Sequence, residues 1–260
     1  MKLTHRTLVQ GAVLLAFALG QPAQGGDTSV HPRLEPAGDS RRLDSSPDWV
    51  LTRDEQGIRS YERKQDGSPL LSFKAEGVID APISLVLSVL LDVDRSDEWI
   101  SHLSESAIVR WVEEPREFVQ FSRFDVPWPV SDRMFVSRVA LSVDPETHTA
   151  VIVYLPADDT VEPRDAVLGS ATGSRFVLTP IDGGARTDFV GIGVAAPKGA
   201  IPPWIVNWVG GSWPHQTIEA LRRQVRKRDV AVTPQIASLY EGFEVRPRLE
   251  FISVDSPAAE

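Results

Sequence analysis

The sequence predicts an α+β fold in which a curved antiparallel sheet is crossed on one face by a long C-terminal helix. The order of elements supports this: two strand-like segments, a short helical region, a long run of strands, and a final helix over 202–228. Turn residues such as Asp182-Gly183-Gly184 separate successive strands, as in antiparallel hairpins. A sheet and a helix that each have one apolar face bury those faces together, so we expect two layers that enclose an apolar space.

Alternation of apolar and polar residues marks the strands. Within 133–143, Arg138 lies opposite a set of inward residues, Phe135, Ser137, Val139, Leu141 and Val143. Gly191 and Gly193 interrupt another alternating run, and glycine inside a strand often marks the close approach of a neighbouring group. The predicted strands are 57–63, 70–79, 106–113, 117–125, 133–143, 149–155, 172–181 and 185–196.

Two helical segments precede most of these strands. We expect Asp80 to cap the first helix, with Pro82 in its first turn. Its apolar residues recur at helical spacing, namely Ile83, Val86, Leu87 and Leu90. The stretch DRSDEWISHL predicts a short second helix, whereas the tail from Asp229 to Glu260 has no clear pattern.

The N-terminus has the pattern of an export signal. Lys2 and Arg6 precede an apolar run, and Ala23-Gln24-Gly25 supplies the small residues of a cleavage site. We therefore expect residues 1–25 to be a signal peptide and the protein to be exported to the periplasm; an uncleaved N-terminal anchor is the alternative. Three further divisions are predicted: a Gly-, Pro- and Ser-rich flexible linker at 26–46, a single domain at 47–230, and a C-terminal extension at 231–260.

Composition excludes several classes of function. The net charge of −9 becomes −11 without Lys2 and Arg6, which argues against binding to nucleic acid. The chain has no Cys, so disulfides, thiolate metal sites and a Cys nucleophile are excluded. No two of the five His share the spacing of metal ligands, and no Gly-x-Ser-x-Gly motif is present. We expect no metal, no cofactor and no catalytic residue.

The final helix contains residues that a helix interior usually avoids. In IPPWIVNWVGGSWPHQTIEALRRQV, Gly210-Gly211 and Pro214 lie near the middle. There Gly costs about 1 kcal/mol and Pro about 3 kcal/mol relative to Ala. We expect a kink that separates an aromatic half, with Trp204 and Trp208 one turn apart, from a more regular half. A moving gate and a static bend that follows the sheet both explain such a kink.

Three separated motifs carry a family resemblance. They are PWPVSDRMFV at 127–136, the segments WVL and GIRSYER within 49–63, and the final helix. In this order they resemble the signature, the opening and the closing helix of START domains, the lipid-transfer family related to the steroidogenic acute regulatory protein. The resemblance extends over about 47–230. It points especially to the phosphatidylcholine-transfer branch and its bacterial relatives.

This resemblance implies the helix-grip fold, in which an apolar tunnel between the sheet and the C-terminal helix holds one lipid. It implies a carrier of a lipid or other hydrophobic small molecule, gated by that helix and in transient contact with membranes. We expect a tunnel of several hundred Å³, as in typical ligand pockets of about 300–1,000 Å³. Two alternatives remain open: a cyclase- or hydrolase-type enzyme of the same superfamily, and a ligand-sensing module that binds a partner. The oligomeric state is not specified.

The resemblance also shows a departure. Sterol-carrying members place an acid and an Arg in the tunnel where this chain has Gln120 and Val139. Gln120 or Ser137 could still donate a hydrogen bond to a ligand. The predicted tunnel lining is Phe124, Phe135, Val139, Leu141, Ile205, Trp208, Val209 and Leu221, and the predicted gate and hinge residues are Trp204, Gly210, Gly211 and Pro214.

Several polar features have two interpretations. Asp132-Arg133 is either a headgroup clamp or a network that holds a turn, and Trp128 either stacks on ligand or covers the core. The basic run 221–229 suits membrane contact or the stabilising placement of cations at a helix C-terminus. His215 is expected to be a polar or kink residue rather than a catalyst.

Overall fold

The computed structural model describes residues 48–64, 71–126, 131–162, 165–169, 174–195 and 203–243; for 194–195, 203–212 and 214 it describes the backbone alone. The predicted signal peptide at 1–25, the predicted linker at 26–46 and Trp128 lie outside the described residues. No helix in the described part of the chain combines the length and the apolar character needed to cross a bilayer.

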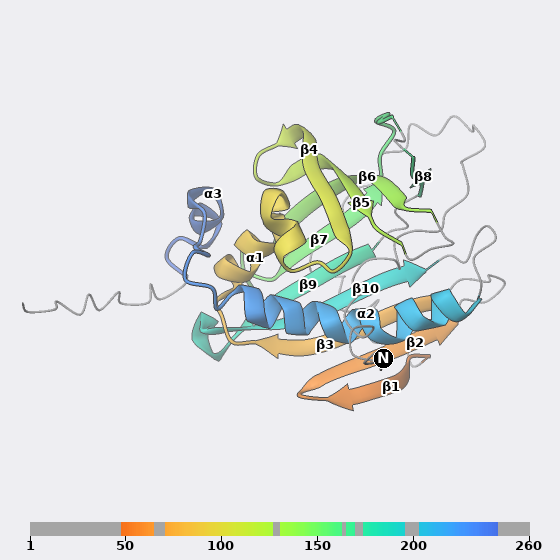
Figure 1. The fold of residues 1–260 in the computed structure, drawn as a ribbon. Helices are drawn as coiled ribbons and strands as arrows, with labels where there is room; N and C mark the ends of the chain where they lie inside the picture. Colours follow the sequence, from red (N-terminus) through yellow and green to blue (C-terminus); the bar gives the residue numbers. More distant parts are fainter. Residues whose placement is uncertain are drawn as a thin grey trace, which may run out of the picture.

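One sheet forms the body of the protein, and the predicted α+β architecture is confirmed (Figure 1). Its strands are β1 (Val50–Glu55), β2 (Ile58–Lys64), β3 (Leu71–Ile79), β4 (Leu103–Glu113), β5 (Glu117–Phe124), β6 (Arg133–Val143), β7 (Ala150–Pro156), β8 (Val167–Leu168), β9 (Ser174–Ile181) and β10 (Arg186–Ala195). The helices are α1 (Ile83–Leu91), η2 (Val93–Glu98), η3 (Asp182–Gly184), α2 (Pro203–Gln224), α3 (Pro234–Ala237) and η4 (Ser238–Tyr240).

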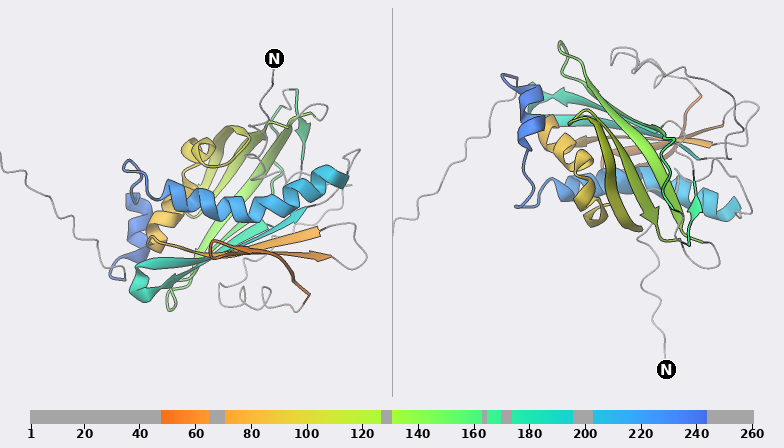
Figure 2. Two further views of the ribbon diagram at one scale, coloured as in Figure 1. Left: turned by 60° about the horizontal axis from the view of Figure 1, so that its bottom comes forward. Right: turned by 90° about the horizontal axis from the view of Figure 1, so that it is seen from above.

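The strand order across the sheet is β1-β2-β3-β10-β9-β7-β6-β5-β4, with β8 paired in parallel beside β6. The register of β4 against β5 shifts three times, after Leu103, after Ile108 and after Trp111. Such shifts bend a strand and increase its twist. The sheet curves around the side on which α2 lies (Figure 2), so the bent strands and the helix face each other across the interior.

Helix α2 approaches the sheet at two glycines. A Cβ added to Gly193 in β10 would lie 2.8 Å from the Trp213 ring, and one added to Gly77 in β3 would lie 3.2 Å from the Ile218 side chain. The strand glycine at 193 therefore marks a close approach, as the sequence predicted for this run. A side chain at 193 would force the Trp213 ring to move, whereas one at 77 would require the Ile218 side chain to shift by a few tenths of an ångström.

The apolar stripe of α1 is buried, as predicted, with Ile83, Val86, Leu87 and Leu90 all in the core. The predicted cap was wrong. Pro82 is the residue that precedes the helix, and no side chain caps it. The carboxylate of Asp80 instead lies 3.9 Å from Arg186 and 3.7 Å from Arg226, both near the surface.

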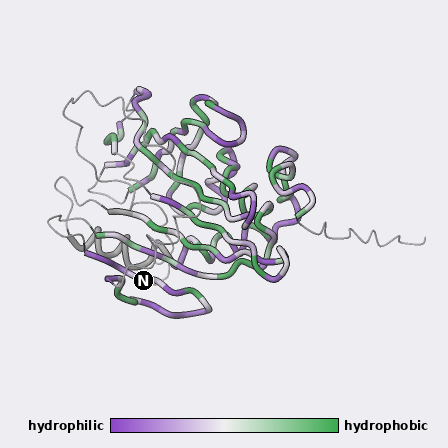
Figure 3. Tube along the Cα trace, turned by 180° about the vertical axis from the view of Figure 1, so that it is seen from behind, coloured by the Kyte–Doolittle hydropathy of each residue, from purple (hydrophilic) through white to green (hydrophobic). Residues whose placement is uncertain are grey.

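One apolar cluster joins the layers. It includes residues from α1, from α2 and from the central strands, such as Leu87, Leu221, Ile152 and Leu178. Figure 3 shows the corresponding pattern along the trace, with green hydrophobic stretches in the strands and mainly purple turns between them. The core therefore occupies much of the space between the sheet and the helices, as expected for two packed layers.

The segment after α2 packs onto α1, although its residues show no clear helical or strand pattern. Ile236 of α3 and Tyr240 of η4 are buried in the same core. The backbone N–H of Thr233 donates to Ser88 Oγ at 3.1 Å, and His148 stacks on Phe243 with ring centroids 3.9 Å apart. The first part of the predicted C-terminal extension is thus attached to the domain.

Gly193→Ala should lower the free energy of unfolding by about 1–3 kcal/mol, because the new methyl group overlaps the rigid Trp213 ring. Elsewhere in a strand, Gly→Ala usually stabilises slightly by restricting the unfolded chain. Urea unfolding measures the change. The same substitution combined with Trp213→Phe is the control; a loss of equal size in both backgrounds would show that the ring is not responsible.

Candidate ligand-binding cavity

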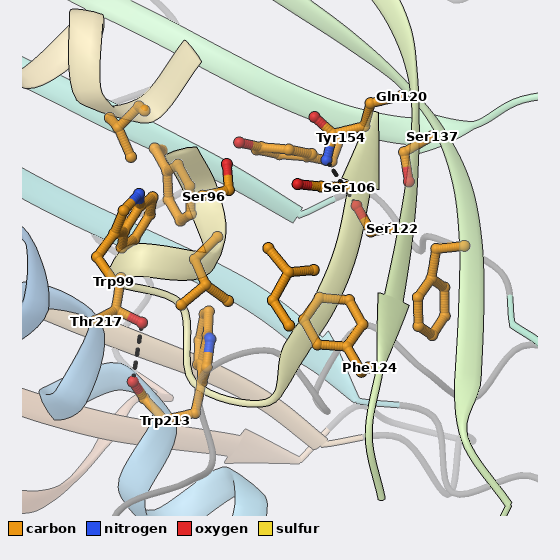
Figure 4. Close-up of a pocket in the computed structure, with 15 residues that line it drawn as sticks. Ser96, Trp99, Ser106, Gln120, Ser122, Phe124, Ser137, Tyr154, Trp213 and Thr217 are labelled. Carbon is orange, nitrogen blue, oxygen red and sulfur yellow. Dashed lines mark hydrogen bonds between the residues drawn. The ribbon is translucent and has the colours of Figure 1, made fainter. Parts of the chain in front are cut away.

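A cavity lies between the inner face of the β4–β6 half of the sheet and the helices that cover it (Figure 4). Its volume is about 50 Å³, room for a few water molecules at roughly 10–15 Å³ each. The lining residues come from eight elements and the loop after η2: Leu90, Ser96, Trp99, Ile100, Leu103, Ser106, Gln120, Ser122, Phe124, Phe135, Ser137, Tyr154, Phe176, Trp213 and Thr217.

Strand alternation places the sheet side of the lining. Gln120, Ser122 and Phe124 occupy every second position of β5, so their side chains share one face. Ser137 of β6 is the direct cross-strand partner of Gln120, and Phe135 is the partner of Ser122. The phenyl rings of Phe124 and Phe135 lie 5.9 Å apart. Polar groups therefore lie beside apolar rings on this wall.

Helical spacing places the opposite side. Trp213 and Thr217 are one turn apart on α2 and both face the cavity. The Thr217 hydroxyl donates to the Trp213 carbonyl oxygen at 3.0 Å. Trp99, just beyond η2, adds a second indole (Figure 4). This side of the cavity is mainly aromatic.

None of the described lining residues has a formally charged side chain at neutral pH. Burial raises the pKa of Tyr154 above its ordinary value, so that its hydroxyl stays protonated. Within the described residues, no group of three or more His, Asp or Glu side chains is placed to hold a metal ion.

Asp132 and Arg133 lie next to the cavity without lining it. Asp132 accepts a hydrogen bond from Arg123 at 2.7 Å and another from the Val126 N–H at 3.2 Å. The Arg123 donor is the main cause of the lowered pKa of the Asp132 carboxyl. Arg133 donates to the carbonyl oxygens of Ser131 and Asp132. These contacts favour the interpretation that the pair holds the entry to β6.

The C-terminal half of α2 is fixed to the rest of the fold. Arg222 donates to the backbone carbonyl oxygens of Val78, Gln56 and Gly57. At the helix end, Gln224 and Lys227 donate to Glu98 at 2.9 and 2.7 Å. Hydrogen bonds from Arg95 first, and then from Lys227 and Gln224, hold the pKa of Glu98 well below its usual range. Much of the basic run 221–229 thus makes contacts inside the protein.

The structure brings some of the predicted ligand residues together and separates others. Phe124, Phe135, Gln120 and Ser137 all line the cavity. Three residues lie instead in the packed core, where they are 1%, 3% and 0% exposed: Val139, Leu141 and Leu221. They share the inward face, but they lie where the layers pack directly on each other. For the other predicted ligand and gate residues the structure describes the backbone alone: Ile205, Trp208, Val209, Trp204, Gly210, Gly211 and Pro214.

Several lining residues were not predicted. Ser122 lies between Gln120 and Phe124 in the alternation, and Trp213 lies one helical turn beyond Val209, so the sequence held a signal for both. Ser96, Ser106 and Tyr154 depend on how distant elements fold together.

The cavity is also smaller than the several hundred Å³ that we expected. Two hollows of about 200 and 250 Å³ lie beside Asp92 and Thr233, but charged side chains line them.

The backbone of α2 runs as one helix across Gly210-Gly211 and Pro214. A continuous helix can still be kinked, so the kink expected at these residues stays a prediction. Whether the helix bends there during function stays a prediction.

The START domain family matches residues 40–227, which is more than half of the chain. The chain belongs to the START domain family. The helix-grip fold inferred from the motifs is confirmed by solved structures with the same architecture.

Individual proteins are similar over most of their length. An uncharacterized protein of Pseudomonas aeruginosa is 28% identical over 185 residues, covering 70% of this chain and 88% of that protein. The phosphatidylcholine transfer protein of Mus musculus is 24% identical over 165 residues, covering 62% and 76%.

Two solved structures are similar in fold. A STAR-related lipid transfer protein fragment from Xanthomonas axonopodis has a TM-score of 0.61 at 25% identity, covering 69% of this chain and 99% of the fragment. Human STARD10 has a TM-score of 0.65 at 16% identity, covering 75% and 82%.

We expect His215 to make the stability of the domain depend on pH. The side chain is 2% exposed, and neither ring nitrogen has a hydrogen-bond partner among the described residues. Burial is the main cause of the lowered pKa of His215; charged groups around it are Arg53, Glu55, Glu219 and Arg222. The folded state thus holds the proton less tightly than the unfolded chain. Stability is full above the ordinary His pKa of about 6.5 and falls as the pH drops below it.

His215→Leu should therefore reduce the loss of unfolding free energy between about pH 7.5 and about pH 5.5. Urea unfolding at both pH values measures the loss. His102→Asn is the control, since it removes a histidine from a loop and suits the positive φ of 61° there. An equal pH dependence in the wild type and in His215→Leu would contradict the assignment.

Proposed function

We propose that the protein binds one lipid, or another hydrophobic small molecule, non-covalently in the cavity under α2 and carries it between membranes. The observation that carries this proposal is the cavity itself, which is enclosed by the curved sheet and α2 and lined by aromatic and neutral polar residues. Relatives support it, since one is a phosphatidylcholine transfer protein and another a STAR-related lipid transfer protein.

Binding must enlarge the cavity. A volume of about 50 Å³ is too small for a lipid chain, whereas removing apolar ligand surface from water contributes roughly 25 cal/mol per Å². A few hundred Å² of ligand surface therefore supplies enough free energy to displace a covering element. The covering element that we assign to this movement is the N-terminal half of α2.

The two halves of α2 suit different roles. The half after Trp213 is held by the core residues Ile218 and Leu221 and by the hydrogen bonds of Arg222. The half before it contains Gly210-Gly211, which weaken a helix by about 1 kcal/mol per Gly. We propose that the first half opens about this point to admit ligand while the second half stays in place.

The proposed setting is supported by the export-signal pattern of the N-terminal sequence. We propose that the chain is exported to the periplasm and that it touches membranes transiently during uptake and release. No catalytic step is assigned to it, because ligand exchange by an opening helix needs only burial and release of apolar surface.

Protein purified from its native periplasm should contain lipid. Native mass spectrometry should detect a mass above that of the chain lacking residues 1–25, and solvent extraction should release the molecule. A chain that carries no lipid, and that takes none up from liposomes, would rule out the carrier function. Recovery from the cytoplasm instead would rule out the proposed location.

Gly210→Ala combined with Gly211→Ala should make the domain more stable and ligand transfer slower. Each Ala favours the helix by about 1 kcal/mol relative to Gly, so opening becomes less favourable. Transfer of a fluorescent lipid between two vesicle populations measures the rate, and thermal unfolding measures stability. Arg223→Ala, on an exposed position of the fixed half, is the control. Higher stability with unchanged transfer would mean that the helix does not open there.

A further inference from the structure

The described polar side chains of the cavity lining are all neutral, and some of them already donate their protons within the protein. Ser96, Ser106 and Thr217 donate their hydroxyl protons to backbone carbonyls at 3.0, 2.7 and 3.0 Å. Each of the three hydroxyls therefore has its one proton already engaged. Among the hydroxyl and amide groups of the lining, the groups left for a ligand therefore come from the sheet. The indole N–H of Trp99, outside the sheet, also has no hydrogen-bond partner among the described residues.

Gln120 and Ser137 are the sheet residues whose polar groups can bind a ligand. The two residues are direct partners across β5 and β6 and both line the cavity. The Gln120 amide is oriented by the bond from its Nε2 to Ser122 Oγ at 3.1 Å. Its Oε1 atom and the Ser137 hydroxyl have no hydrogen-bond partner among the described residues. The pair thus offers an acceptor and a donor side by side, which is the pattern that a hydroxyl group needs.

The described surroundings of Gln120 and Ser137 in the cavity lining contain no charged side chain. On this face of β6 the charged residue is Arg133, two positions before Phe135. Arg133 does not line the cavity, and its guanidinium donates to the carbonyl oxygens of Ser131 and Asp132. Residues 203–214 of α2 include no Asp, Glu, Lys, Arg or His. Among the described lining residues, neither a phosphate nor a carboxylate would find a counter-charge.

We infer that the cavity selects an uncharged lipid whose hydroxyl or carbonyl group hydrogen-bonds to Gln120 and Ser137. This inference rests on the proposed function and adds the class of ligand to it. A buried phosphate or carboxylate without a counter-ion carries a large desolvation penalty, whereas a hydroxyl exchanges its hydrogen bonds with water for bonds to the amide and to the serine. Aromatic rings can hold a quaternary ammonium group, but they leave the phosphate of a choline lipid unpaired.

Three probes with one acyl chain separate these cases: monooleoylglycerol, oleoyl-lysophosphatidylcholine and oleate. They share the apolar part, so differences in affinity report the polar group. The indole emission of Trp99 and Trp213, both in the lining, measures binding below the micelle concentration of each probe. Monooleoylglycerol should bind at least about tenfold more tightly than the other two at neutral pH.

Two variants test the residues. Gln120→Leu keeps the size of the side chain and removes the amide; it should weaken monooleoylglycerol binding about tenfold and abolish the preference. Ser137→Ala should act in the same direction with a smaller effect. Ser142→Ala is the matched control, because Ser142 lies on the same strand at the opposite parity and outside the lining. Circular dichroism confirms that each variant is folded.

The outcomes are distinct. Equal or tighter binding of oleoyl-lysophosphatidylcholine, or a preference that persists in Gln120→Leu, overturns the inference while leaving lipid binding intact. Binding of none of the three probes, together with no lipid in the native protein, overturns the proposed function itself. Preference for monooleoylglycerol that is lost in Gln120→Leu and kept in Ser142→Ala supports both.

Discussion

The close seating of α2 on the sheet is the contact on which the rest of the structure depends. Trp213 lies over Gly193 and Ile218 over Gly77, where the absence of side chains lets the helix reach the strands. The same Trp213 closes the cavity on its other side. One indole therefore sets the distance between the layers and lines the site, so that the size of the cavity and the packing of the helix are not independent quantities.

Polarity divides the protein into two regions. Charged side chains pair near the surface, as Arg95 does with Glu98 and Asp229, whereas the cavity lining contains only neutral groups among the described residues. This division follows from the energetics of burial, since an exposed ion pair loses little hydration while a buried unpaired charge loses most of it. The anchored end of α2 uses ionic contacts, and the part beside the cavity uses packing.

The sequence was informative where the physics is local. Alternation located the strands from β2 to β10, and helical spacing located α1 and the final helix, because each buries one face. The strand β1, the short β8 and the helix α3 were missed; their pairing depends on distant residues.

For the site, alternation identified Phe124, Phe135, Gln120 and Ser137. It could not tell that Val139 and Leu141 pack in the core, since an inward apolar residue looks the same whether it faces side chains or open space. Tyr154 and Ser106 reach the cavity only through the assembled sheet.

The segment that follows α2 changes what counts as the folding unit. The family match ends at residue 227, yet Ile236 and Tyr240 are buried against α1, and Ser88 of α1 accepts a hydrogen bond from the Thr233 backbone. A chain that stopped at the family boundary would leave an apolar face of α1 open to water. The folded unit of this protein therefore extends past residue 227, to Tyr240 at least, and a boundary drawn from the family match alone would cut through its core.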